Sequence, residues 1–299
     1  MAKIVECIPN FSEGRRKDVI EGFVKISKSV AGVTLLDYSG DESHNRCVFT
    51  LVGDPNGIRE VAFELAKFAK ENIDMTKHKG EHPRMGAADV IPFVPIKGVT
   101  MDECIDLSKE VGERVAKELG IPVFLYEDSC TKESRRNLAA VRKGQFEGMA
   151  KKMAKPEWAP DFGEAAPHPT AGVVAVGARM PLIAFNVNLS TADVEIANKI
   201  SKIIRGSSGG LKYCKAIGIL LEDKNIAQVS MNLVNYEGTP IYRVVELIKI
   251  EAARYGVKVI GTELVGLAPA KALIDAAEYY LQLEDFDFTK QVLENHILR

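Results

Sequence analysis

Lys3-Ile-Val-Glu-Cys-Ile-Pro-Asn-Phe-Ser-Glu-Gly14 opens the chain with alternating apolar positions that stop at a polar turn. The alternation predicts a strand over 3–8, because successive side chains of a strand point to opposite faces. Residues 182–188 form a second predicted strand, and its end at Asn186-Val-Asn-Leu-Ser190 resembles Pro9-Asn-Phe-Ser12. These two related beginnings indicate that the chain contains one structural unit twice.

Each of these strands is followed by the same order of predicted elements. Apolar residues at helical spacing predict helices, and short apolar runs between turn residues predict strands. The order strand, helix, strand, strand, helix, strand covers 3–8, 17–29, 33–37, 47–52, 55–68 and 89–94, and again 182–188, 191–204, 213–221, 226–233, 240–255 and 257–261. This is the order of the ferredoxin-like motif. We therefore predict an α+β fold of duplicated ferredoxin-like (βαββαβ) subdomains, with antiparallel sheets backed by helices and a cleft between them.

A segment rich in proline and glycine separates the two halves. It covers residues 151–180 and contains the only tryptophan, Trp158. Before it, a capping box at Thr100 and Glu103 predicts a helix to about residue 119, and a further strand is predicted over 121–126. We predict an N-terminal subdomain over 1–180, including a connector over 151–180, and a C-terminal subdomain over 181–299.

Composition and charge exclude several classes of protein. The chain has 299 residues, 46% hydrophobic and 27% charged, and a net charge of −2, which is typical of a soluble globular protein. That balance argues against nucleic-acid or membrane partners. The first residues lack the pattern of a signal peptide, so we expect a cytoplasmic location. The odd number of widely spaced cysteines predicts reduced core thiols instead of disulfides or a zinc site: Cys7, Cys47, Cys104, Cys130 and Cys214.

Thr76-Lys-His-Lys-Gly-Glu-His-Pro-Arg-Met-Gly86 is the segment richest in chemically active groups. Its two histidines stand among three cations and one acid, and cationic neighbours favour the neutral, base-competent imidazole. His78-Lys-Gly-Glu-His82 also fits the H-x-x-E-H pattern of some zinc peptidases. That chemistry needs both imidazoles on one helix, whereas Gly80 and Pro83 disfavour a helix here. We therefore predict no metal site.

Several separate segments together carry a resemblance to a known family. These are Val5-Glu-Cys-Ile-Pro-Asn-Phe-Ser-Glu-Gly14, Asn45-Arg46, His78–Gly86, Trp158–Gly163, Leu182–Leu189 and Ala227–Asn232. In these segments the chain resembles the glutamate formimidoyltransferases, which occur alone in microbes and as the front half of formimidoyltransferase-cyclodeaminase in animals. The resemblance covers nearly the whole chain and includes no cyclodeaminase half.

The resemblance implies two ferredoxin-like subdomains, a homodimer, and tetrahydrofolate bound as co-substrate without a metal. It implies transfer of the formimino group from N-formimino-L-glutamate to N5 of tetrahydrofolate, whose tail can be polyglutamylated. The family's catalytic histidine falls on His82, and its folate-binding stretch falls on residues 163–172. The family's aspartate at the loop before Asn45 is replaced by Ser39 here, which leaves Asp37 or Asp41 to take its place.

A neutral histidine can take a proton from the attacking nitrogen and return one to the leaving nitrogen. His82 is the residue predicted for this role, with His78 as support or second candidate. Cations are needed to hold two carboxylate-rich substrates. The predicted substrate- and folate-binding residues are Asn45, Arg46, Lys77, Lys79, Arg84, Gly163, His168, Pro169, Thr170 and Gly172, with Trp158 as a stacking candidate.

Three alternatives remain open from the sequence. The chain can be a glutamate formyltransferase that uses 5-formyltetrahydrofolate, since the chemistry of the two donors is similar. It can be a non-catalytic folate-binding module. A metal hydrolase that uses His78, Glu81 and His82 is the most remote.

Overall fold

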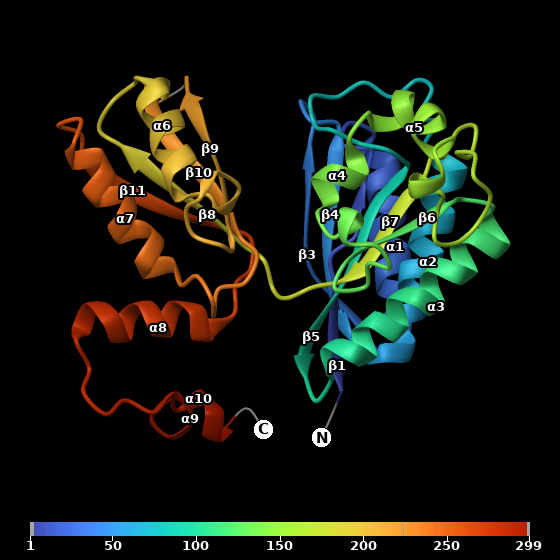
Figure 1. Cartoon of the computed structure of the whole chain (residues 1–299). Helices are drawn as coiled ribbons and strands as arrows, with labels where there is room; N and C mark the ends of the chain where they lie inside the picture. Colours follow the sequence, from blue (N-terminus) through green and yellow to red (C-terminus); the bar gives the residue numbers. More distant parts are fainter. Residues whose placement is uncertain (1–2, 223, 298–299) are drawn as a thin grey trace. The chain divides into compact units, whose positions relative to one another are not determined.

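The computed structural model describes residues 3–222 and 224–297, and the chain divides into two compact units with their boundary between Arg179 and Met180 (Figure 1). Each unit contains one β-sheet and several helices. The predicted α+β class is therefore confirmed.

The first unit contains a seven-stranded sheet. Its strands are β1 (Ile4–Cys7), β2 (Asn10–Phe11), β3 (Val33–Asp41), β4 (Arg46–Gly53), β5 (Ala88–Lys97), β6 (Val123–Glu127) and β7 (Val174–Ala178). Its helices are α1 (Lys17–Ser29), α2 (Pro55–Asn72), α3 (Met101–Leu119), α4 (Leu138–Arg142) and α5 (Gln145–Met153).

Local signals in the sequence set the ends of the long helices. Asp54 caps α2 by accepting hydrogen bonds from two backbone amides, and Pro55 occupies the first turn. Thr100 and Glu103 form the predicted capping box of α3. Gly120 ends α3 in a left-handed conformation, with φ of 65°.

The prediction of a purely antiparallel sheet is wrong for the first unit. The first five strands pair in antiparallel fashion: β4 lies next to β3 and β1, β5 lies next to β1, and β2 pairs with both β4 and β5. β7, however, pairs in parallel with both β5 and β6. Consequently residues 151–180 are more than a connector, because β7 lies inside the sheet and is fully buried.

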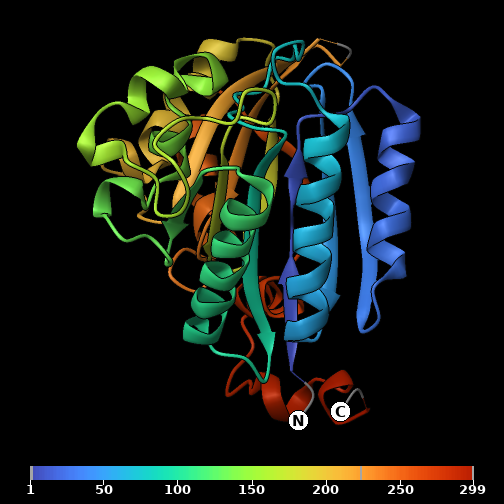
Figure 2. The same cartoon turned by 90° about the vertical axis from the view of Figure 1, so that its right-hand side faces the viewer.

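Helices cover both faces of this part of the sheet. Val174 and Val176 of β7 join the core beneath α1, α2 and α3, whereas Val173 and Ala175 join a second core with residues of α4 and α5. Alternate residues of one strand point to opposite faces, so the two helix groups lie on opposite sides. Figure 2 shows α1, α2 and α3 side by side over one face.

The second unit contains a four-stranded antiparallel sheet in the order β11-β8-β10-β9. In chain order its elements are β8 (Ile183–Leu189), α6 (Val194–Ile204), β9 (Cys214–Leu221), β10 (Ile226–Leu233), α7 (Ile241–Ala253), β11 (Val259–Val265), α8 (Ala270–Leu281), α9 (Phe288–Gln291) and α10 (Glu294–Ile297). α6 begins later than the predicted helix over 191–204, because Asp193 is its capping residue and the carboxylate of Asp193 accepts from the Glu195 amide.

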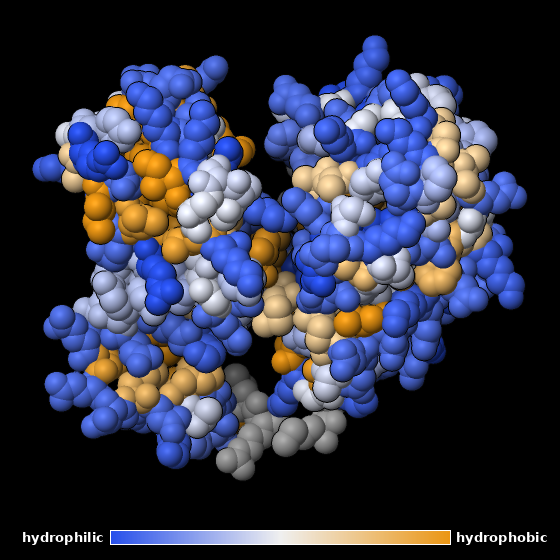
Figure 3. Space-filling model, in the orientation of Figure 1, coloured by the Kyte–Doolittle hydropathy of each residue, from blue (hydrophilic) through white to orange (hydrophobic). Residues whose placement is uncertain are grey.

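The surface of the second unit carries exposed apolar side chains. Figure 3 shows apolar side chains on the visible face around α6 and α7. Ile203 of α6 and Ile250 of α7 are among the exposed large hydrophobic residues of this unit. Among the described residues, no helix is both long and apolar enough to cross a bilayer.

β3 extends further than the sequence indicates, and this extension positions the candidate site. The predicted strand ends at residue 37, but Ser39, Gly40 and Asp41 also pair with β4, opposite Val48, Cys47 and Arg46. The ladder of hydrogen bonds therefore holds these polar residues in strand geometry. The turn between the two strands contains only residues 42–45, and Asn45 has a left-handed φ of 47°.

Candidate active site

The His78–His82 loop connects α2 to β5 and contains no helix, as Gly80 and Pro83 predict. Gly80 packs against the β3–β4 turn so closely that a Cβ there would lie 2.2 Å from the His44 carbonyl oxygen. The Glu81 amide donates to the Ser43 carbonyl. The described residues contain no group of three or more His, Cys, Asp or Glu side chains that could hold a metal ion.

His78 has both ring nitrogens engaged by the protein. Its Nε2 lies 2.9 Å from the Asn45 carbonyl oxygen, which can only accept, so Nε2 carries the proton. Its Nδ1 accepts from Nε of Arg84 at 3.2 Å. Burial lowers the pKa of His78. These contacts suit a neutral imidazole that holds two segments together.

Arg84 is buried, and each of its guanidinium nitrogens has a protein partner. Besides His78, it donates to Gln145 at 3.0 Å and to both carboxylate oxygens of Glu147. The Glu147 carboxyl has a lowered pKa, chiefly because of this hydrogen bond. Arg84 therefore fixes the loop to α5 and presents no free donor.

Asn45 is likewise used for internal contacts. Its side-chain oxygen accepts from the Gly14 amide at 2.9 Å, and its amide nitrogen donates to the Lys79 carbonyl at 3.0 Å. Asn45 thereby joins the turn after β2, the β3–β4 turn and the histidine loop.

His82 has one engaged and one available ring nitrogen. Its Nδ1 lies 2.7 Å from the Pro83 carbonyl oxygen, so Nδ1 carries the proton and Nε2 holds the lone pair in the neutral ring. Burial, followed by the charges of Arg46 and Arg142, lowers the pKa of His82 to about 4. At neutral pH the ring is a base with its lone pair on Nε2.

Asp89, at the start of β5, organises the charges that act on His82. Its fully buried carboxylate forms ion pairs with Nη1 of Arg46 at 2.8 Å and with Nη2 of Arg142 at 2.6 Å. It also accepts a hydrogen bond from the Met85 amide at 2.9 Å. Burial alone would raise the pKa of Asp89, but the two guanidiniums hold it below its ordinary value. One carboxylate faces two guanidiniums, so this three-residue group has an excess of one positive charge.

The two arginines differ in their remaining contacts. Arg46 also donates to the Asn10 side chain from two of its nitrogens. Arg142 has a buried Nε that lacks a hydrogen-bond partner among the described residues. A buried donor without a partner costs free energy, and an anionic ligand would satisfy it.

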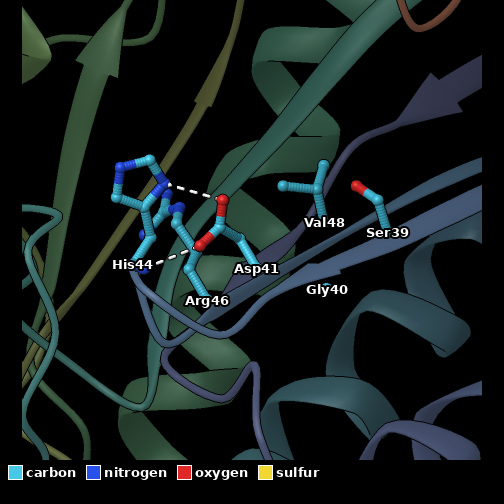
Figure 4. A pocket seen from close by; sticks show the side chains of 6 residues that line it. All are labelled: Ser39, Gly40, Asp41, His44, Arg46 and Val48. Atoms are coloured by element: carbon cyan, nitrogen blue, oxygen red, sulfur yellow. Dashed lines mark hydrogen bonds and ion pairs between the residues drawn. The ribbon is translucent and has the colours of Figure 1, made fainter. Parts of the chain in front are cut away.

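A cavity opens on one face of the paired strands β3 and β4, beside this group. It is lined by Ser39, Gly40, Asp41, His44, Arg46 and Val48 (Figure 4). Nδ1 of His44 lies 3.2 Å from the Asp41 carboxylate, and the backbone amide of His44 donates to the same carboxylate at 2.7 Å. The His44 and His82 rings meet edge to face, with centroids 5.9 Å apart.

A second cavity lies on the other side of Asn45 and His78. Its lining includes Glu13, Arg16 and Lys77. Lys77 is 84% exposed and pairs with Asp74 at 3.2 Å, and Lys79 is also exposed. These two lysines are the most accessible cations of the predicted binding set.

Residues 168–172, at the end of the predicted folate-binding stretch 163–172, form a tight turn next to the histidine loop. Nδ1 of His168 accepts from the amides of Thr170 and Ala171, at 3.3 and 3.0 Å. The Thr170 carbonyl accepts from the Met75 amide at 2.8 Å, which ties the turn to the start of the loop. His168 therefore shapes this segment, while Gly163 and Pro169 are exposed.

Gly172 is required where this segment crosses the histidine loop. It has a left-handed φ of 70°, and a Cβ would lie 2.2 Å from the Met85 carbonyl oxygen. Gly172→Ala is expected to lower the free energy of unfolding by more than the roughly 1–3 kcal/mol that the backbone conformation alone costs. Urea unfolding measures the difference. Gly120→Ala is the matched control, since φ is 65° there and no atom lies within 4 Å; equal losses for the two variants would refute the steric argument.

Trp158 is occupied by the protein itself. Nζ of Lys152 lies 3.8 Å from the centre of its ring, a cation–π contact. The same nitrogen donates to the carbonyls of Ala140 and Val141 at 2.6 Å. One face of the indole is thus covered, which leaves less of it for stacking on a ligand.

The structure adds Asp89, Arg142, His44 and Asp41 to the candidate residues. Of these, the sequence prediction considered only Asp41, as a replacement for the aspartate at position 39. The sequence does contain a signal for two of these residues: Asp89 is an acid at the start of a buried apolar strand, and His44 directly precedes Asn45-Arg46. Arg142 has no such signal, because it lies in a polar segment.

Comparison with known proteins identifies the family of the chain. Residues 4–179 match the family model described as the N-terminal subdomain of the formiminotransferase domain, and residues 184–297 match the model described as the formiminotransferase domain. The chain is 69% identical to the glutamate formimidoyltransferase of Streptococcus pyogenes serotype M1, over 100% of both chains. It is 49% identical to that of Thermoplasma acidophilum, over 95% of this chain and 94% of the relative. It is 47% identical to the formimidoyltransferase-cyclodeaminase of Gallus gallus, over 95% of this chain but 53% of the relative. The chain therefore belongs to the formiminotransferase family.

Proposed function

We infer that this chain is a glutamate formimidoyltransferase, which moves the formimino group of N-formimino-L-glutamate to N5 of tetrahydrofolate and releases glutamate. The observation that carries this function is the 69% identity to a glutamate formimidoyltransferase over the full length of both chains. Tetrahydrofolate is a co-substrate in this reaction, and no metal is required.

His82 is proposed as the base of the reaction. N5 of tetrahydrofolate must lose its proton when it attacks the amidine carbon, and the free Nε2 of a neutral imidazole can accept it. His78 is proposed as a positioning residue, because both of its nitrogens are engaged. Arg84 and Asn45 are proposed to hold the loop instead of binding a substrate.

The group of Arg46, Asp89 and Arg142 is proposed to attract a substrate carboxylate. Its excess positive charge and the unpartnered Nε of Arg142 favour an anion next to His82. Residues 163–172 are proposed to bind the folate, with contacts from Gly163, Pro169, Thr170 and the backbone that His168 and Gly172 shape. This proposal rests on the family resemblance and on the turn's contact with the loop.

Lys77 and Lys79 are proposed to receive the glutamate tail of the folate. Lys79→Ala is expected to raise the KM for tetrahydrofolate by about two- to fivefold at unchanged kcat, because an exposed ion pair contributes roughly 0–1 kcal/mol. The increase should grow when the tail carries three glutamates. Steady-state kinetics with both folates provides the measurement, and Lys67→Ala on α2 is the control. Equal KM values for Lys79→Ala and the wild type would exclude this role.

We propose that the two units are duplicated ferredoxin-like subdomains, spanning 1–180 and 181–299. The strand order β5-β1-β4-β3 in the first unit corresponds to β11-β8-β10-β9 in the second, with helices in the same places of the chain. From the family resemblance we also propose a cytoplasmic location and a homodimer. Sedimentation analysis tests the oligomeric state.

Whether the transferred group comes from formiminoglutamate or from 5-formyltetrahydrofolate is decided by a turnover assay. Purified protein is assayed with tetrahydrofolate and formiminoglutamate, and separately with 5-formyltetrahydrofolate and glutamate. Turnover of the first pair supports the proposed function. Turnover of only the second identifies a formyltransferase, and binding of folate without turnover of either pair identifies a binding module.

A further inference from the structure

We propose that His44, held by Asp41, is a second proton-transfer residue, which protonates the leaving amine while His82 deprotonates the attacking amine. The inference rests on the proposed function, and it divides between two imidazoles a task that one histidine was predicted to perform. It assigns a role to a histidine–carboxylate pair that the family resemblance did not identify.

The first argument is the orientation of the His44 ring. The Asp41 carboxylate contacts both Nδ1 and the backbone amide of His44, at 3.2 and 2.7 Å. A carboxylate accepts hydrogen bonds, so Nδ1 carries a proton and Nε2 is the working nitrogen. Figure 4 shows this second nitrogen pointing away from Asp41. About half of the His44 side chain is exposed, so a ligand can reach it.

The second argument is the place of the pair. His44 lines the cavity on the face of β3 and β4 together with Arg46, whose charge acts on His82. The edge-to-face contact of the two rings, with centroids 5.9 Å apart, puts both imidazoles beside one reacting centre. The packing that enforces this is tight, because Gly80 of the histidine loop lies against the backbone of His44.

The third argument is the opposite electrostatic environment of the two rings. Burial and the guanidiniums of Arg46 and Arg142 lower the pKa of His82, whereas the ring of His44 contacts a carboxylate, that of Asp41. A base and an acid that act in one reaction need different surroundings of this kind. The charged groups around His44 are Asp41 and Glu42 in its own hairpin, Arg15 (which donates to the Glu42 carbonyl), Arg46 on β4, and Glu81 and His82 on the loop.

The proton balance of the reaction closes with these two groups. N5 of tetrahydrofolate forms a bond to the amidine carbon, and its proton passes to Nε2 of His82. The bond from that carbon to the α-nitrogen of glutamate then breaks, its electron pair stays on this nitrogen, and the nitrogen takes the proton from Nε2 of His44. His82 finishes protonated and His44 neutral. One proton passed from His82 to His44, through solvent, restores the starting state.

The test compares His44→Asn with the wild type, and with His296→Asn as a matched control on the second unit. We expect kcat with formiminoglutamate to fall about 10²-fold, with the KM of both substrates within threefold. Added imidazole should restore His44→Ala in proportion to its protonated form, an effect that a merely structural histidine would not give.

Asp41→Asn provides a second variant that keeps the imidazole. Without the carboxylate the His44 ring loses the contact that orients it, so kcat should fall while the KM of both substrates stays within threefold. The inference is overturned if His44→Asn retains kcat within threefold, if only KM changes, or if added imidazole fails to restore His44→Ala. If the wild type transfers the formimino group but the His44 variants do not show the expected changes, only the role of His44 is refuted. If the wild type does not transfer the formimino group, the proposed function is refuted as well.

Discussion

Asparagine in place of His82 is expected to lower kcat by about 10²–10⁴-fold, with little change in the KM of either substrate. The reason is that Nδ1 of His82 is committed to the Pro83 carbonyl, so Nε2 is the only nitrogen of this ring that can accept the proton of N5. An asparagine side chain keeps the size and polarity but offers no base. Steady-state kinetics with formiminoglutamate and tetrahydrofolate measures the loss, and thermal unfolding reports on the fold.

The pH dependence gives an independent measure of the same group. The pKa of His82 is lowered to about 4 by burial and by Arg46 and Arg142, so the base form persists through the neutral range. On its acid side, the kcat/KM profile of the wild type should therefore fall only near pH 4, more than two pH units below the roughly 6.5 of an ordinary histidine. An acid limb near 6.5, or a His82→Asn variant that keeps kcat within threefold of the wild type, would remove His82 from the mechanism.

His78→Asn supplies the contrasting case within the same loop. Its imidazole joins the Asn45 carbonyl to Arg84, so its removal should lower the free energy of unfolding by about 1–3 kcal/mol. A catalytic loss equal to that of His82→Asn in a fully folded His78→Asn protein would contradict the assignment of the two histidines.

The sequence identifies the histidine loop well because its signals are local. Gly80 and Pro83 exclude a helix, and the near absence of apolar residues over 76–86 argues against a core segment there. The capped helices that flank the sheet are local in the same way. Asp54 and the Thr100–Glu103 box contact amides two or three residues away, so the same signals appear in sequence and structure.

The charges around His82 are not local, and for that reason the sequence does not reveal them. Asp89 follows Arg46 by 43 residues, and the contact depends on the pairing of β2 with both β4 and β5. Arg142 reaches the same carboxylate from α4, on the opposite side of the sheet from the long helices. A carboxylate at the start of a buried strand indicates a buried ion pair, but the sequence does not show which cationic residues pair with it.

Two features were missed although their signals are present. Gly172-Val-Val-Ala-Val-Gly177 is a short apolar run bounded by glycines, the pattern of a buried parallel strand, but neighbouring prolines favoured a connector. Ser39, Gly40 and Asp41 have turn composition, yet hydrogen bonds to β4 keep them in a strand. Tertiary pairing outweighs local propensity at both places.

Asp89→Asn is expected to cause the largest loss of stability, about 3–5 kcal/mol in the free energy of unfolding. The substitution preserves shape but leaves two guanidiniums, largely withdrawn from water, without a counter-charge. Loss of the negative charge also strengthens the positive field at His82, so the pKa of His82 should fall further and its acid limb should move to lower pH. Urea unfolding and the kcat/KM profile measure the two effects.

The pH dependence of stability separates this charge effect from a packing defect. The folded-state pKa of Asp89 is lower than its unfolded value of about 3.9, so its contribution is complete above that pH and is lost as the pH falls through the folded-state pKa. The stability difference between wild type and Asp89→Asn should therefore shrink below about pH 4. Glu110→Gln is the matched control: its pair with Arg59 is exposed at 2.9 Å and contributes about 0–1 kcal/mol. A difference that stays constant to pH 2, or one no larger than that of Glu110→Gln, would show that Asp89 does not hold the two arginines as a charged group.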